Sequence, residues 1–198
     1  GMVAFAGSQN LIEPGYNKPA NHKLGREWKE LVARVEGPAV SALNLLFCTD
    51  WYSETEVKLI DELGTVPTPA GEIEAQVIPS GPGFSTENNL RVFTLLLYSA
   101  QRRLSITSPY FVPDESLLYA ITTAAQRGVE VELFVSEAGD QFMVYHAQCS
   151  YYEALLRAGV RIYLYPAPAI LHSKFFSVDD DVAVLGSSNM DTVSYTHL

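Results

Sequence analysis

Cysteine, positive charge and long apolar runs are all scarce in this chain of 198 residues. Its two cysteines, Cys48 and Cys149, lie far apart and outside any Cys-x-x-Cys spacing, so we expect two buried free thiols in a reducing compartment rather than a metal pair. Only 13 lysines and arginines stand against 23 acids, a net charge of −10, which disfavours a general nucleic-acid binder. Apolar runs such as ALNLLF fall far short of the ~20 residues that a membrane span needs, so we expect these residues by themselves to be soluble.

Strand and helix patterns alternate along most of the chain. The first part predicts a strand at 2–7, a polar loop at 12–26, a strand at 30–37 and a helix from Pro38 to about Trp51. After a stretch rich in Pro, Gly and Thr, strands are predicted at 74–80, 104–108, 129–135 and 160–165 and around Asp179–Asp181, and helices at 86–102, 113–128 and 139–159. This order predicts an α/β fold with a mostly parallel mixed sheet flanked by helices on both faces.

An internal repeat links the two ends of the chain. When Gly7 is aligned with Gly186, VAFAGSQNL lies on VAVLGSSNM, and the Gly, Ser and Asn positions coincide. At the same offset, the partners of His172, Lys174 and Asp179 precede residue 1. We therefore expect an upstream His, Lys and Asp in a longer parent protein.

The second copy of the repeat gathers groups that suit a phosphate. On a strand, residues two apart point to the same face, so His172 and Lys174 are predicted to share one site, with Ser187 and Asn189 at the end of the next strand. A neutral imidazole can attack a phosphodiester, lysine donates to phosphate oxygens, and Ser and Asn supply further donors. Asp179 has the opposite parity, so it is predicted to order the turn rather than to act as the base.

The spacing His-x-Lys-x4-Asp-x6-Gly-Ser-x-Asn resembles the signature of the phospholipase D superfamily, whose members carry two such motifs, one in each homologous half. SPYFVPDESLL and LHSKFFSVDDDVAVLGSSNMD, among other stretches, resemble bacterial cardiolipin synthases over about residues 1–191. The resemblance implies transfer of a phosphatidyl group from one phosphatidylglycerol to another, with release of glycerol, a phosphohistidine intermediate and no metal or cofactor. It implies catalytic roles for His172, Lys174 and Asp179 and phosphate binding by Ser187, Asn189, Ser8 and Asn10.

The same resemblance predicts the organisation of the chain and the place of its parent. We expect a remnant of the first phospholipase D-like half at 1–62, a linker at 63–72, the second half at 73–192 and a non-native tail at 193–198, so that the fold is incomplete at both ends. The parent enzyme is expected at the bacterial cytoplasmic membrane, held there by N-terminal segments upstream. Because the first-motif His and Lys are absent from the sequence, the 198 residues alone are expected to be inactive.

Several alternatives stay open at this point. With water as acceptor the enzyme would be a phospholipase D-type hydrolase, with another alcohol a different phosphatidyltransferase, and a decayed site would leave a lipid-headgroup binding module. The turn at 79–83 could bind a phosphate, although a plain turn is favoured, and Tyr110 and Phe111 could line a channel or pack in the core. His146 is expected to be structural, and the three acids Asp179–Asp181 to face solvent rather than a metal.

Overall fold

The computed structural model describes residues 1–81, 84 and 87–191, which fall into two compact units. One unit is formed by Gly1–Ala6 and Val32–Pro79, and the other by Gly7–Leu31 and the described residues from Ser80 onward. The expected tail at 193–198 and part of the turn at 79–83 lie outside the described residues. Within the described part of the chain, no helix is long and apolar enough to cross a membrane.

The smaller unit combines two strands with one long helix. Strand β1 (Val3–Gly7) pairs with β3 (Val32–Glu36), and α2 (Ala39–Thr55) follows with Pro38 as its N-cap. A short 3₁₀ turn, η1 (Ile60–Leu63), lies against α2. Cys48 is buried in α2 as predicted, whereas Cys149 is only half-buried; both are free thiols.

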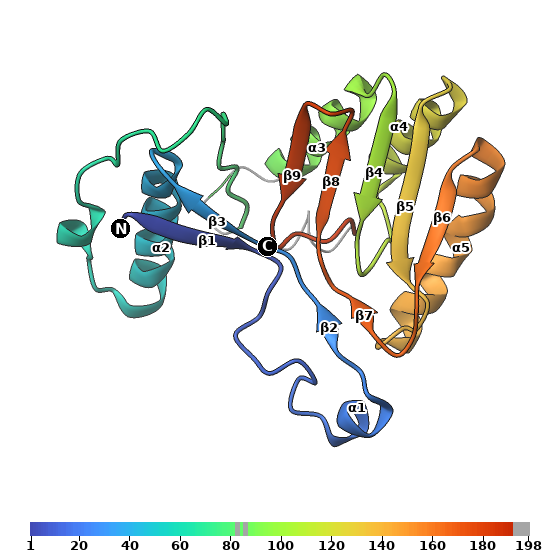
Figure 1. Ribbon diagram of the computed structural model, residues 1–198, viewed down its shortest axis with the longest axis horizontal. Helices are drawn as coiled ribbons and strands as arrows, with labels where there is room; N and C mark the ends of the chain where they lie inside the picture. The colour runs from blue at the N-terminus through green and yellow to red at the C-terminus, as the bar shows by residue number, and fades with distance from the viewer. Residues whose placement is uncertain (82–83, 85–86, 192–198) are drawn as a thin grey trace. The chain divides into compact units, whose positions relative to one another are not determined.

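The larger unit is built on a five-stranded mixed sheet (Figure 1). The spatial order is β6 (Arg161–Tyr165), β5 (Glu130–Ser136), β4 (Arg103–Thr107), β8 (Phe175–Val178) and β9 (Val182–Leu185). The first three strands are parallel, and β8 and β9 add antiparallel pairs. The predicted α/β class with a mixed sheet is therefore confirmed.

One face of this sheet holds the core. Leu104, Leu133 and Phe176 project from it against α3 (Asn88–Ser99), α4 (Glu115–Gln126) and α5 (Phe142–Ala158), which lie together behind the sheet in Figure 1. The opposite face carries an ion-pair network in which Glu132 accepts from Arg103 and Arg161. The prediction of helices on both faces was wrong for the described residues, because the strands alternate apolar and polar side chains instead of being apolar on both sides.

Short elements outside the main sheet position the candidate site. Helix α1 (Pro19–Leu24) and strand β2 (Trp28–Lys29) form within and just after the segment predicted as a loop, and β2 pairs in parallel with β7 (Ile170–Leu171). This pairing brings residues near 30 beside residues near 172. The prediction of a strand at 74–80 was wrong: the segment forms no strand, with residues 74–76 exposed and 77–80 half-buried.

Asp179 stabilises the turn between β8 and β9. Its backbone is left-handed, with a φ of 51°, and its carboxylate accepts the backbone N–H groups of Gln101, Arg102 and Arg103 at 2.7–3.1 Å. These hydrogen bonds lower the pKa of the carboxyl below its ordinary 3.8. Asp179 thus ties the start of β4 to the β8–β9 turn, at the far end of β8 from Lys174, and its position supports a structural rather than a catalytic role.

Replacing Asp179 by alanine is expected to lower the melting temperature of the chain by about 5 °C. The variant no longer accepts the three backbone N–H groups. Its alanine must also adopt the left-handed backbone conformation, which is unfavourable for a residue with a Cβ and no polar side chain. Because the carboxylate favours its ionised form in the fold, its contribution is present above pH ~4 and is lost as the pH falls through the lowered pKa. Asp179→Asn, which tolerates the same backbone, is expected to lose less; equal melting of all three proteins would contradict this role.

Candidate functional site

His172 and Lys174 lie in the short connection between β7 and β8 rather than on one strand. The backbone N–H groups of His172 and Ser173 both donate to the carbonyl of Lys29, at 2.8 and 3.0 Å, which ties this connection to β2. The predicted strand geometry was therefore wrong in detail, because the chain must leave β7 to join the main sheet. The predicted convergence is nevertheless present: Lys174 Nζ lies 3.1 Å from His172 Nε2 and 2.7 Å from the His172 carbonyl oxygen.

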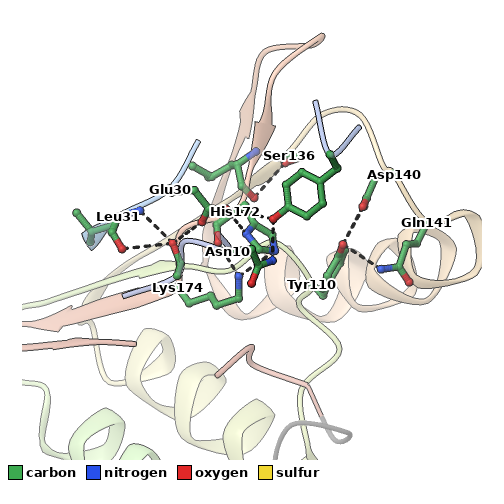
Figure 2. A network of polar contacts seen from close by, with 12 residues as sticks. Asn10, Glu30, Leu31, Tyr110, Ser136, Asp140, Gln141, His172 and Lys174 are labelled. Carbon is green, nitrogen blue, oxygen red and sulfur yellow. Dashed lines mark hydrogen bonds and ion pairs between the residues drawn. The ribbon is translucent and has the colours of Figure 1, made fainter. Parts of the chain in front are cut away.

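Glu30 completes the environment of the imidazole (Figure 2). Its Oε1 lies 2.7 Å from His172 Nδ1, and both side chains are largely buried. Because the ammonium of Lys174 can only donate, Nε2 of His172 must accept a hydrogen bond from it. The ring proton is then on Nδ1, which donates a hydrogen bond to Glu30. This arrangement fixes the tautomer and orientation of the ring, with the Nε2 lone pair on the Lys174 side.

Ser8 and Asn10 support Glu30 in this structure. The hydroxyl of Ser8 donates to Glu30 Oε2 at 2.5 Å and accepts the N–H of Leu31 at 3.0 Å. The amide of Asn10 donates to the hydroxyl of Tyr16 at 2.8 Å, and that hydroxyl donates to Glu30 Oε1 at 3.4 Å. The two residues predicted to bind phosphate thus contact the carboxylate partner of His172, directly or through Tyr16.

Two tyrosine rings lie edge-on to the imidazole. The ring centroids of Tyr16 and Tyr110 lie 6.2 and 6.5 Å from that of His172. Tyr110 donates its hydroxyl to both oxygens of Asp140 and accepts from the amide of Gln141 at 3.0 Å; this group lies to one side of His172 in Figure 2, with Glu30 and Lys174 on the other. Of the two aromatics singled out in the sequence, Tyr110 therefore borders the site.

The remaining features singled out in the sequence lie outside this network. Phe111 is fully buried in the core. His146 is exposed on α5, where its ring packs on Phe142 and Tyr145. Asp180 pairs with Arg102 at 3.1 Å, and Asp181 is exposed. The expectation that these acids face solvent agrees with their positions.

Burial shifts the titration of both motif residues. The pKa of His172 is lowered from 6.5, chiefly by burial and further by the Lys174 cation, against the opposing effect of Glu30. Burial also lowers the pKa of Lys174 from 10.5 to about 8. His172 is therefore neutral at pH 7, while Lys174 is still mostly protonated, which is the combination that a nucleophilic imidazole beside a phosphate needs.

Ser187 and Asn189 follow β9 in a turn that starts beside Lys174, where the N–H of Gly186 donates to the Lys174 carbonyl at 3.2 Å. Ser187 is exposed. The Oδ1 atom of Asn189 is buried and makes no hydrogen bond within the described residues. The structure thus places this turn next to the site, and the phosphate-binding role of the two side chains remains a prediction.

Sequence comparison supplies the family. A model described as "Cardiolipin synthase, PLD-like domain" matches residues 94–197, which include the whole His172 motif. The chain belongs to this family. Proteins named cardiolipin synthase A are similar over 96% of the chain, at 38% identity in Pectobacterium carotovorum subsp. carotovorum (strain PC1), 39% in Serratia proteamaculans (strain 568) and 37% in Buchnera aphidicola subsp. Acyrthosiphon pisum (strain APS).

The chain spans 39% of the length of these relatives. Among solved structures, it is similar to the phospholipase D family member Nuc from Salmonella typhimurium, with a TM-score of 0.47 and 22% identity over 55% of this chain and 69% of that one. A phosphatidylserine synthase from Haemophilus influenzae Rd KW20 gives a TM-score of 0.46 and 22% identity over 56% and 30%. The family assignment rests on the sequence matches.

Glu30, Tyr16 and Asp140 were not singled out from the sequence. Glu30 lies 142 residues before His172, at the start of an alternating strand pattern. Acidic residues at such positions are usually structural, so the pattern gave no sign of a function. The one available signal was chemical: a histidine held in one tautomer needs an acceptor for its other nitrogen. With 23 acids in the chain, that signal alone does not select one.

Proposed function

We propose that this chain contributes one half of the active site of a cardiolipin synthase, which transfers a phosphatidyl group between two phosphatidylglycerol molecules and releases glycerol. The observation that carries the proposal is the Glu30–His172–Lys174 arrangement, in which a buried neutral imidazole is oriented by a carboxylate and adjoins a cation. Membership of the cardiolipin synthase domain family supports the choice of lipid and acceptor.

In the proposed chemistry, two histidines share the work. One imidazole nitrogen attacks phosphorus, forming an N–P bond as the P–O bond to glycerol breaks, and the second histidine gives its proton to the departing oxygen. That second histidine then takes the proton of the acceptor hydroxyl, whose oxygen attacks phosphorus and breaks the N–P bond. His172 suits either position, because its Nε2, once Lys174 turns to a phosphate oxygen, can be a nucleophile or hold the transferable proton.

Lys174 is proposed to bind the phosphate oxygens. Its ammonium now donates to His172 Nε2, so a phosphate oxygen that replaces Nε2 as its acceptor would free the lone pair of the ring. The turn with Ser187 and Asn189 would add neutral donors beside Lys174. Asn189, whose Oδ1 makes no hydrogen bond within the described part of the chain, would reorient towards the ligand. Ser8 and Asn10 would act chiefly by holding Glu30.

The test uses the complete gene product, the full-length enzyme, with phosphatidylglycerol labelled in the head-group glycerol. Cardiolipin and free glycerol in equal amounts would support the proposal. Phosphatidic acid with glycerol and no cardiolipin would indicate a hydrolase and contradict it. The 198-residue chain assayed in parallel is expected to give no product, since its sequence contains a single His-x-Lys pair and two histidines are required.

The pH dependence of the full-length enzyme should report Lys174. Because the lysine must stay protonated to hold phosphate, kcat/KM is expected to fall as the pH rises through about 8. The pKa of His172 is lowered from 6.5, so the imidazole stays neutral, and able to act as the nucleophile, as the pH falls from 7 to below 6.5. Lys174→Arg, whose guanidinium does not titrate in this range, should lose the fall near pH 8; an unchanged alkaline limb in this variant would assign it to another group.

A further inference from the structure

Three large apolar side chains that follow residues of the site in the sequence are exposed. Phe142 and Met143, in the first turn of α5, are 75% and 77% exposed, and Leu11 is fully exposed. Exposure of large apolar side chains to water is unfavourable, and where several gather on a surface they usually mark a contact with another molecule. None of the three has a role in the chemistry proposed above.

Leu11 and Phe142 each come directly after a residue that hydrogen-bonds to a tyrosine of the site. Leu11 follows Asn10, which donates to Tyr16, and Phe142 follows Gln141, which donates to Tyr110. Since both tyrosine rings lie edge-on to His172, the apolar side chains begin one residue beyond the walls of the site. A surface that covers them would therefore lie close to the residues that contact the imidazole.

A basic segment adjoins the apolar turn. Residues 18–29 carry four of the 13 basic residues of the chain, Lys18, Lys23, Arg26 and Lys29, against a single acid, Glu27. Arg26 donates to the carbonyl oxygen of Gly139 at 3.5 Å, three residues before Phe142. In a chain of net charge −10, this local excess of positive charge beside exposed apolar groups fits an anionic surface with an apolar interior.

We propose that Leu11, Phe142 and Met143, together with the basic segment 18–29, form a docking face for an anionic phospholipid bilayer. The inference rests on the proposed function in one respect: the reactive phosphodiester of a phospholipid lies at the head-group level, directly above the acyl chains. A site that reaches this group without extracting the lipid needs an apolar rim that enters the interface and cations that meet the head groups. Both are present around His172, so attachment by these residues would add to any membrane anchor elsewhere in the protein.

The test is flotation of the 198-residue chain with large unilamellar vesicles, of phosphatidylglycerol with phosphatidylcholine or of phosphatidylcholine alone. The chain is expected to bind the anionic vesicles, and Phe142→Ser/Met143→Ser is expected to lower the partition coefficient by about tenfold or more. Lys23→Glu/Arg26→Glu should remove the preference for anionic lipid. Leu156→Ser, an exposed position in the last turn of the same helix, is the matched control and should bind like the unchanged chain.

Three outcomes would overturn the proposal: no binding of the unchanged chain, equal binding of all variants, or an equal loss in the Leu156→Ser control. If the Phe142/Met143 variant kept its vesicle binding but lost self-association in analytical ultracentrifugation, the face would cover a second copy of the chain instead. Thermal melting monitors folding of each variant. Vesicle binding needs no turnover, so failure here is distinct from failure of the transferase assay.

Discussion

His172→Ala is expected to lower kcat/KM of the full-length enzyme for phosphatidylglycerol by at least about 10⁴-fold. Without the imidazole, one of the two groups that exchange protons and phosphorus is missing, and Lys174 and Glu30 remain as a buried cation and a buried carboxylate without their shared partner. The rate of cardiolipin formation in phosphatidylglycerol vesicles is the measurement.

The matched control for this variant is His22→Ala. His22 is also paired with a carboxylate, Glu13, at 3.2 Å, but the His22 side chain is 57% exposed and the pair lies outside the site. Because the variant keeps all four cations of segment 18–29, we expect its activity within about twofold of the unchanged enzyme. Residual activity of His172→Ala above a few per cent, with a normal melting curve, would show that the reaction does not pass through this imidazole.

Glu30→Gln is expected to lower kcat by about 10³-fold while KM changes little. The amide can offer its N–H₂ to Nδ1 and thereby select the wrong tautomer, which places the ring proton on Nε2, where the lone pair is needed. Loss of the negative charge also removes the interaction that raises the pKa of His172, so the imidazole of this variant should titrate at lower pH.

Glu27→Gln tests whether the effect belongs to Glu30 or to charge in general. Glu27 is exposed and pairs with Lys29, so its replacement removes the same charge from the same segment without touching the imidazole. Its kcat is expected to be unchanged. Similar losses in both variants, or a loss in KM alone for Glu30→Gln, would exclude a positioning role for Glu30.

Local patterns predicted much of the larger unit. The helices predicted at 113–128 and 139–159 correspond to α4 and α5; Asp114 caps α4 by accepting from the N–H of Ser116, and Gly159 ends α5 with a φ of 98°. The pairing of His172 with Lys174 and the turn-forming role of Asp179 also agree with the sequence. Each of these features depends on residues close together in the sequence, so periodicity and capping or turn residues were enough to predict it.

The long-range contacts of the site were beyond such reasoning. Glu30 reaches His172 because β2 pairs with β7, and two strands of two residues each leave no periodic signal. The segment at 74–80 alternates like a strand but is not assigned as one in the described structure. The division into homologous halves and the phosphate roles of Ser187 and Asn189 remain predictions, because no contact within the described residues tests them.

The most direct test of the site is ¹⁵N NMR of the imidazole of His172 in the 198-residue chain, titrated from pH 8 to pH 4, with His172→Ala to assign the signals. The arrangement of Glu30 and Lys174 predicts a proton on Nδ1, an unprotonated Nε2 at pH 7 and titration below pH 6.5. A ring protonated on Nε2 at pH 7, or one that titrates above 6.5, would contradict the preorganised site on which the proposed function depends.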